Sequence, residues 1–363
     1  MKNYKLRLTA ISPIHIGTGE SYEPTNFVID KGYLYEFDEF KFFHNLSKGE
    51  QKSFISITSS QEKDSLFQIH AFIKNHKKAA IDALTHKVQV TKGMEKDYFN
   101  KIGRVVQNEG GGKNNQKIFN RFHIERTLRS PNIKRVYIPG SSIKGSISTA
   151  LQEVAYKQNP RKWEEEYHPK NPTLAIMKNL SISDAKPVKT FALVGYSLNK
   201  ERFEDDEQGP KNKVETIYTG SIFEVNISFK ELEPKTTFTI ENLINACNSH
   251  YFENFESMFR QKDDGKDQYI CDYFADSFYD KYINFRPGKN QFLLRVGKHS
   301  GARAVTIEGL RDIRIKDSGG GPKRKRNVWR NLPYETTTWL FGGKESDTKT
   351  LLPFGWLLCE IID

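Results

Sequence analysis

The sequence predicts an α+β fold, and three observations support this class. Residues 4–10 alternate apolar and polar side chains, which is typical of a strand with one covered face. Apolar residues recur at helical spacing over 64–88 and 240–259, which predicts amphipathic helices. Further apolar runs follow one another across short turns and predict antiparallel hairpins. Helices mixed with hairpins favour an α+β fold over a doubly wound parallel sheet.

After the first strand, the chain is expected to form a hairpin and then a helical segment. Asp30, Lys31 and Gly32 supply a turn between two apolar runs. Residues from about 36 to 95 are expected to be helical, with these apolar side chains on one face: Leu66, Ile69, Phe72, Ile73 and Ala80. The histidines of this segment are interpreted as solvated or packed side chains, so a metal site is not expected at His70, His76 or His86.

Loops, helix starts and strands are also expected after residue 100. Residues 107–117 are expected to be a flexible, glycine-rich loop, and 319–331 a basic loop. A helix follows residue 140, and another begins at Thr239, a favourable N-cap residue. The expected strands are 180–188, 190–200, 213–232, 291–294, 335–341 and 351–362.

Composition and charge narrow the class of partner. The 363 residues are 37% hydrophobic and 12% aromatic, which is sufficient for a packed core. The formal net charge is +11, and the sequence pI is about 9.2. Such a balance favours a polyanionic partner, usually nucleic acid and sometimes an anionic membrane surface.

The cysteines and the lengths of the apolar runs indicate in which cellular compartment the protein is expected. Cys247, Cys271 and Cys359 are far apart and form no Cys-x-x-Cys pair, so neither a zinc site nor a disulfide framework is expected. The N-terminal segment alternates like a strand and lacks the apolar run of a signal peptide. No apolar run approaches the roughly 18 residues of a membrane span. We therefore expect a cytoplasmic protein without membrane contact and without a cofactor or metal.

A basic stretch at residues 117–140 suits single-stranded nucleic acid. Its cations alternate with aromatic side chains, so phosphates can be neutralised while bases stack. The alternative is a solvated, charged hairpin whose aromatic side chains face the core. The candidate RNA-binding residues of this stretch are Arg121, Arg126, Arg129 and Arg135.

The stretch Pro139-Gly140-Ser141-Ser142-Ile143-Lys144-Gly145 marks the start of a helix. Unpaired backbone N–H groups, serine hydroxyls and Lys144 together form a candidate phosphate cradle. The alternative is that Ser141 or Ser142 only caps the helix. The order of residues does not match a Walker loop, so ATP hydrolysis is not expected.

A second candidate is the glycine-rich loop at residues 295–303. Its glycines allow close approach of a sugar-phosphate backbone, and its basic and titratable side chains supply charge. The alternative is a tight hairpin with exposed charges. The candidate residues of this loop are Arg295, Gly297, Lys298, His299, Ser300, Gly301 and Arg303.

Four motifs occur in order along nearly the whole chain: "SPIHIGTGE", "YIPGSSIKGSISTAL", "RVGKHSGA" and "LPFGWLLCEI". Together they resemble the RAMP superfamily of CRISPR-associated RNA-binding proteins. Within it, the arrangement is most similar to the fifth-subunit family of type III-A (Csm) effector complexes, which caps the filament at the crRNA 3′ end. One departure is Ser148, where many relatives have an arginine; the phosphate contact that the resemblance implies there is either lost or supplied elsewhere, for instance by Arg129 or Arg135.

The resemblance implies an RRM-like, ferredoxin-like core with an inserted helical segment and a β-hairpin thumb. The expected regions are 1–232, with the insertion and thumb at about 36–136, and 233–363, with the glycine-rich loop. Carried over residue by residue, RNA contacts fall on His15, Gly17 and Gly19, on Ser141, Ser142, Lys144 and Gly145, and on Gly297, Lys298, Ser300 and Gly301.

The function implied by this resemblance is a non-catalytic crRNA-binding subunit. Its expected partners are crRNA, target RNA, and the backbone and small subunits of the complex, with host trimming nucleases as further candidates. One alternative is metal-dependent cleavage through Asp30 or Asp38, although neither is expected to have a second carboxylate placed to hold a divalent ion with it. The other is a metal-independent endoribonuclease processing precursor crRNA with His15 as general acid or base.

Overall fold

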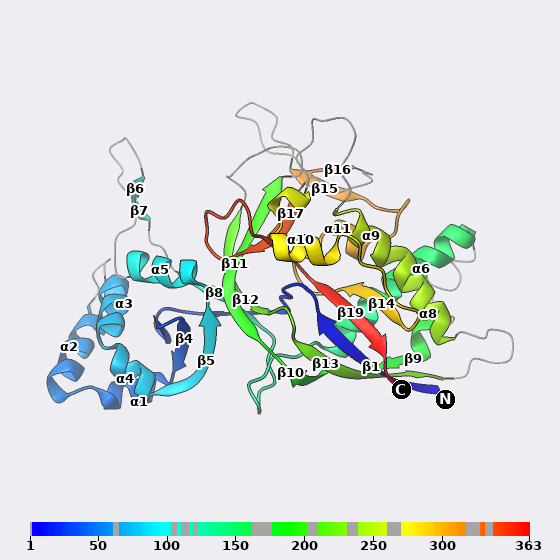
Figure 1. Ribbon diagram of the computed structural model, residues 1–363. Helices are drawn as coiled ribbons and strands as arrows, with labels where there is room; N and C mark the ends of the chain where they lie inside the picture. The colour runs from blue at the N-terminus through cyan, green and yellow to red at the C-terminus, as the bar shows by residue number, and fades with distance from the viewer. Residues whose placement is uncertain are drawn as a thin grey trace.

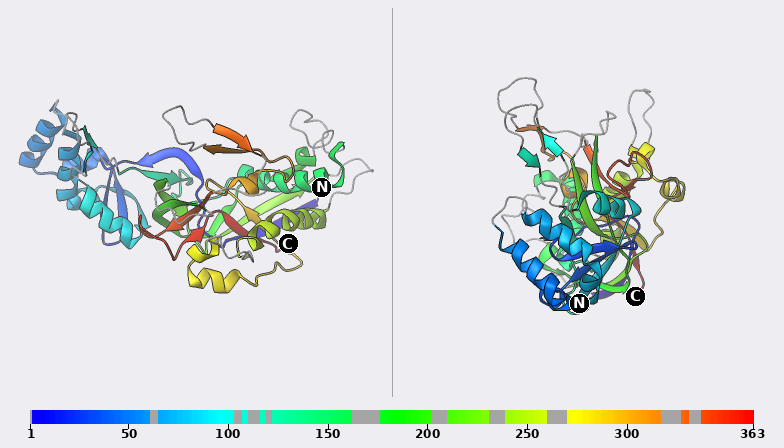
Figure 2. Two further views of the ribbon diagram at one scale, coloured as in Figure 1. Left: turned by 90° about the horizontal axis from the view of Figure 1, so that it is seen from above. Right: turned by 90° about the vertical axis from the view of Figure 1, so that its left-hand side faces the viewer.

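A computed structural model describes residues 2–60, 65–102, 107–109, 116–118, 122–161, 176–201, 210–230, 239–259, 270–316, 327–330 and 337–363. The molecule is elongated, with a group of helices at one end and a sheet that carries both termini toward the other (Figures 1 and 2). Runs of strands that pair mostly antiparallel are separated by runs of helices along the chain, which confirms the α+β prediction.

One sheet is antiparallel and joins the two ends of the chain. Strand β1 lies between β13 and β19, with Leu6 opposite both Val225 and Ile361. The predicted alternation of β1 is confirmed, because Leu6, Leu8 and Ala10 are buried. In spatial order its strands are β10 (Lys186–Lys189), β13 (Ile222–Phe229), β1 (Lys2–Ala10), β19 (Trp356–Ile361) and β14 (Gln291–Arg295), and β9 (Leu180–Ile182) also pairs with β13.

Helices cover one face of this sheet. Helix α6 (Gly140–Gln158) buries Ile143, Ile147 and Leu151 at successive turns, and each such side chain contributes about 1.5–3 kcal/mol. Helix α8 (Ile240–Cys247) packs beside it against β14. An antiparallel sheet with helices on one face is compatible with the expected RRM-like, ferredoxin-like core.

The helix expected over 240–259 begins as predicted but is interrupted. Thr239 and Asn242 form a reciprocal capping box. A π-helical turn at Asn248–Phe252 then separates α8 from α9 (Glu253–Glu256). The turn places His250 against Glu153 of α6, with Nδ1 and Oε2 3.0 Å apart.

A second sheet connects the core to the inserted segment. Its central strand β11 pairs with β12, β17 and β5 along its length, so the sheet branches. The hairpin predicted around Asp30 is confirmed, with Lys31 and Gly32 both at positive φ. In spatial order the strands are β2 (Gly17–Tyr22), β8 (Ile124–Thr127), β12 (Lys211–Ile217), β11 (Ala192–Glu201), β5 (Leu84–Val90), β4 (Tyr33–Phe37) and β3 (Phe27–Asp30), with β17 (Thr337–Gly342) and β18 (Leu352–Pro353) off this path.

The inserted segment has its own small core. Phe37 and Val28 of the hairpin pack against Phe42, Leu46 and Ile73 of the helices. These helices form one end of the molecule (Figure 2). They are α1 (Glu39–Asn45), α2 (Lys48–Thr58), α3 (Ser65–Asn75) and α4 (Lys77–Asp82), and α5 (Lys92–Lys101) follows β5.

The prediction of continuous helix over 36–95 is wrong at residues 84–90. These residues form β5, which pairs with β4 and β11 and buries Val88 and Val90 in alternation. The β-branched residues of this stretch suit a strand once two partner strands are present. His86 therefore lies on a strand, whereas His70 lies on α3.

Three other differences concern loops and turns. Residues 107–109, 116 and 117, expected within a loop, belong to the short hairpin of β6 (Gln107–Glu109) and β7 (Gln116–Ile118), while 110–115 lie outside the described residues. Asn327–Arg330, expected within a basic loop, is strand β16 and pairs with β15 (Ile313–Lys316). The run expected as one strand over 213–232 divides at Gly220, whose φ of 81° turns the chain from one sheet to the other.

Short helices complete the described chain: α10 (Asp276–Tyr282), α11 (Ala302–Val305) and 3₁₀ turns at Ile176–Lys178 and Ile270–Tyr273. Strands from both sides of the expected boundary near residue 232 share the first sheet, and the boundary itself lies outside the described residues, so the division stays a prediction. Among the described helices, none combines the length and the apolar character that crossing a bilayer requires.

Candidate nucleic-acid interface

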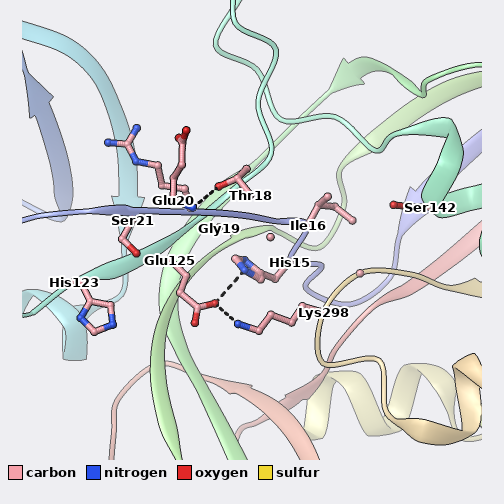
Figure 3. A pocket seen from close by; sticks show the side chains of 13 residues that line it. His15, Ile16, Thr18, Gly19, Glu20, Ser21, His123, Glu125, Ser142 and Lys298 are labelled. Atoms are coloured by element: carbon pink, nitrogen blue, oxygen red, sulfur yellow. Dashed lines mark hydrogen bonds and ion pairs between the residues drawn. The ribbon is translucent and has the colours of Figure 1, made fainter.

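A pocket of about 550 Å³ lies where segments far apart in the sequence meet (Figure 3). The N-terminal loop, strand β8, the start of α6 and the glycine-rich loop all contribute to it. These are the segments that carry most of the candidate residues. The lining residues are residues 15–21, His123, Glu125, Arg126, Ser142, Gly297 and Lys298.

Two loops are joined at the base of the pocket by a backbone contact. The N–H of Lys298 donates to the carbonyl oxygen of His15 over 2.9 Å. Gly297 has a φ of 85°, and a Cβ at this position would lie 2.5 Å from the same oxygen. Only glycine combines this φ with this approach, so Gly297 allows the N-terminal and glycine-rich loops to meet.

Strand β2 forms an exposed wall of the pocket. It lies at the edge of the second sheet, and its pairing with β8 shifts register between Gly17 and Ser21. Residues Gly17–Glu20 are exposed, and Gly19 adopts a φ of 82° with open space around its α-carbon. A bulged edge strand of this kind presents backbone polar groups to a ligand.

An ionic cluster lies inside the pocket (Figure 3). Glu125 Oε2 is 2.6 Å from Lys298 Nζ and 3.4 Å from His15 Nε2. His15 is fully buried, and its Nδ1 lies 2.7 Å from the carbonyl oxygen of Glu215. The His15 imidazole and the Lys298 ammonium together lower the pKa of Glu125 to about 2, so this carboxylate is ionised at any working pH.

Three comparisons with known proteins bear on these segments. A family model described as the RAMP superfamily matches residues 7–298. The chain belongs to the RAMP superfamily. The matched range contains the N-terminal loop, the helix-start motif and the glycine-rich loop as far as Lys298, all of which line the pocket.

One curated protein and two solved structures are also similar to this chain. A protein of Streptococcus thermophilus described as "CRISPR system Cms protein Csm5" is 27% identical over 162 residues, 44% of this chain. The match spans 40% of that relative's length. A chain of the cryo-EM structure of a Csm–crRNA–target RNA ternary complex in a type III-A CRISPR-Cas system has a similar fold, with a TM-score of 0.61, 16% identity and coverage of 99% and 100% of the two chains. The crystal structure of T. onnurineus Csm5 matches with a TM-score of 0.53, 16% identity and coverage of 97% and 99%.

The RAMP helix-start motif reaches the pocket through Ser142. The interpretation of Ser141 or Ser142 as a helix cap is wrong, because Pro139 occupies the N-cap position and no side chain caps the helix there. Instead, the N–H of Gly140 donates to Asp184 Oδ1 over 2.8 Å. Lys144 Nζ donates to the carbonyl oxygen of Leu180 over 2.7 Å, while Ser141 and Gly145 are exposed.

Two candidate arginines of the basic stretch are paired inside the protein. Arg126 pairs with Glu36 and lies over the ring of Tyr22, 3.9 Å from its centroid. Arg129 pairs with the fully buried Glu215. Arg135 is exposed, and Arg121 lies outside the described residues.

Much of the glycine-rich loop is held by internal contacts. Arg295 is buried and donates from Nε to the carbonyl oxygen of Phe354 over 2.9 Å. His299 packs against Trp339 and Phe354, and its burial lowers its pKa to about 3. Ser300 donates to the carbonyl oxygen of Gly297 over 2.7 Å. Gly301 and Arg303 lie at the start of α11, where Arg303 donates to Ser257 over 2.8 Å.

The carboxylates considered for metal-dependent cleavage have structural partners. Asp30 lies 2.5 Å from Lys77 Nζ, and Asp38 caps α1 by accepting the N–H of Lys41. Within the described ranges, no group of three potential metal-ligating side chains occurs.

The sequence reasoning did not identify the acidic residues of the pocket. Glu20 and Glu125 line it, and His123 stands two residues before Glu125. Alternate residues of a strand share a face, so the pair His123 and Glu125 carried a detectable signal. Because the surrounding residues are basic and the net charge is +11, only basic side chains were predicted as RNA contacts in this stretch.

The low pKa of Glu125 predicts a loss of stability in acid. Glutamate in an unfolded chain has a pKa of about 4.3. Ionised Glu125 therefore stabilises the fold above that pH, and this contribution to stability disappears as the pH falls toward about 2. Urea unfolding at about pH 5 and about pH 3 measures the effect. Glu125→Gln removes this titration and should show a smaller loss between the two pH values; an equal loss would contradict the assignment.

Proposed function

We propose that the protein is a non-catalytic crRNA-binding subunit of a type III-A CRISPR-Cas (Csm) ribonucleoprotein effector complex, which caps the filament at the crRNA 3′ end. The observation that carries this proposal is the convergence of the N-terminal loop, the basic stretch, the helix-start motif and the glycine-rich loop on one pocket. The net charge of +11 and the relatives described as Csm5 support it.

A binding role agrees with the contacts of the groups considered for catalysis. A general acid or base must reach the reacting oxygen, whereas His15 is fully buried between Glu125 and the backbone of Glu215. Asp30 and Asp38 serve as an ion-pair partner and a helix cap. In this proposal the partners are crRNA, target RNA and other Csm subunits, with trimming nucleases as further candidates. By binding these partners the protein would support crRNA maturation and antiviral defence.

Binding and cleavage assays on the same samples test this proposal. The purified protein is incubated with a labelled single-stranded RNA that carries a repeat-derived 3′ portion, first in EDTA and then in Mg²⁺ or Mn²⁺. We expect a gel shift without cleavage in every condition. Cleavage in EDTA that disappears in His15→Ala would favour the metal-independent endoribonuclease instead. Cleavage only with metal would point to Asp30 and Asp38.

Lys298→Ala is expected to weaken RNA binding at least tenfold, because it removes the exposed hydrogen-bond donor of the pocket and leaves Glu125 without its lysine partner. Lys144→Ala is expected to weaken binding by a smaller factor that is nearly equal for different RNA sequences, since backbone contacts carry no sequence information. Filter binding at several salt concentrations measures both effects.

Lys48→Ala makes the same charge change on the exposed surface of α2, at the far end of the molecule, and serves as the control. An equal loss of affinity in Lys48→Ala and Lys298→Ala would contradict a specific role of the pocket. A strong dependence of the Lys144→Ala effect on RNA sequence would contradict a backbone contact there.

A further inference from the structure

The charges of the pocket cancel, although the chain as a whole is strongly basic. Lys298 and Arg126 line it together with the carboxylates of Glu20 and Glu125. Arg126 is also paired with Glu36, which further reduces the positive potential. A phosphate entering this pocket therefore meets two carboxylates, so the interior is poorly suited to a phosphate group.

Glu125 offers an acceptor to a ligand. Both of its contacts, to Lys298 and to His15, fall on Oε2, and within the described residues no hydrogen bond reaches Oε1. Its side chain is 26% exposed and lines the pocket. An ionised carboxylate only accepts hydrogen bonds, so its natural partner is a donor such as a hydroxyl group.

A hydrogen-bond donor, Lys298, lies beside the acceptor oxygen of Glu125. The side chain of Lys298 is 48% exposed, and its ammonium has three N–H groups, one of which donates to Glu125. The Nε2 of His15 is buried and lies 3.4 Å from Oε2, so it contacts the carboxylate and leaves the ligand to Glu125 and Lys298. A hydroxyl group can donate to Glu125 and accept from Lys298 at once. A phosphate oxygen at neutral pH cannot donate.

We infer that the pocket receives a ribose, that Glu125 accepts the hydrogen of its 2′-hydroxyl, and that this contact distinguishes RNA from DNA. The inference rests on the proposed RNA-binding function and names its selectivity. The 2′-hydroxyl is the group by which a protein tells RNA from DNA, and carboxylates bind ribose hydroxyls in nucleotide-binding folds. His15 is a positioning residue, because it is held by Glu215 and fixes the carboxylate of Glu125.

The test compares binding of a single-stranded oligouridine RNA with its 2′-deoxy and 2′-fluoro counterparts. The 2′-fluoro form keeps the sugar pucker of RNA but cannot donate a hydrogen bond. We expect the wild-type protein to prefer the RNA over both analogues by about tenfold or more, since a hydrogen bond to a charged group is of this size. In Glu125→Ala the preference should fall close to one.

Two further variants keep the test decisive. Glu125→Gln retains an acceptor oxygen and should keep part of the preference. Glu20→Ala makes the same charge change in the same pocket as Glu125→Ala and should leave the preference unchanged. Equal gains in affinity for all three oligonucleotides in Glu125→Ala and Glu20→Ala would overturn the inference while leaving RNA binding intact. Failure of the wild-type protein to bind any of them would overturn the proposed function itself.

Discussion

Gly297→Ala is expected to abolish RNA binding and to lower the free energy of unfolding by roughly 2–4 kcal/mol. The new Cβ would lie 2.5 Å from the carbonyl oxygen of His15, and alanine is strained at a φ of 85°. Relief of this overlap separates the N-terminal loop from the glycine-rich loop, and Lys298 then moves away from Glu125. Chemical denaturation and filter binding measure the two effects.

Two other glycines provide matched controls. Gly19 has a φ of 82°, but a Cβ added there would meet no atom within 4 Å beyond its chain neighbours, so Gly19→Ala should show only the strain, about 1–2 kcal/mol. Gly145 lies within α6 in open space, so Gly145→Ala should increase stability by about 0.5–1 kcal/mol. Similar losses of stability in Gly297→Ala and Gly19→Ala would contradict the proposed overlap with His15.

Local patterns predicted the elements whose signals lie within a few residues. The alternation of β1, the turn at Asp30 to Gly32 and the cap at Thr239 all follow from neighbouring side chains, and all are confirmed. The interruption of the helix at Asn248–Phe252 was not predictable from spacing. A single π-turn shifts the apolar stripe slightly and keeps Phe255 and Phe259 buried.

Strand β5 was missed because its environment is not local. Residues 84–90 follow two helices and continue their apolar content. The alternation of Val88 and Val90 indicates a strand only when the partner strands β4 and β11 are known. Strand preference depends on such cross-strand packing more than on the residue itself.

The candidate site was predicted at the level of segments and not of every side chain. A glycine motif predicts a positive φ or a close approach of another backbone, and Gly297 has both where it meets the carbonyl oxygen of His15. Side-chain roles depend on partners that sequence spacing does not supply. Arg126 and Arg129, proposed as phosphate contacts, have carboxylate partners 90 and 86 residues away.

Arg129→Ala is expected to destabilise the fold by about 3–5 kcal/mol, because it leaves the fully buried carboxylate of Glu215 without its cation. Among the described residues, the remaining donors to the Glu215 carboxylate are the hydroxyl of Tyr22 and the N–H of Thr127, each 3.2 Å away and neutral. Any loss of RNA binding in this variant should therefore follow the loss of folded protein, as measured by urea unfolding and by binding below the unfolding transition.

Arg135 provides the matched control, since it is exposed and belongs to the same basic stretch. Arg135→Ala should change stability by less than about 0.5 kcal/mol. If RNA passes over this surface, Arg135→Ala should also reduce the salt dependence of binding by about one counterion.

The double variant Arg129→Ala with Glu215→Gln should recover part of the stability, because the unpaired buried charge of Glu215 is removed. A stable Arg129→Ala protein that no longer binds RNA would instead establish Arg129 as a direct phosphate contact.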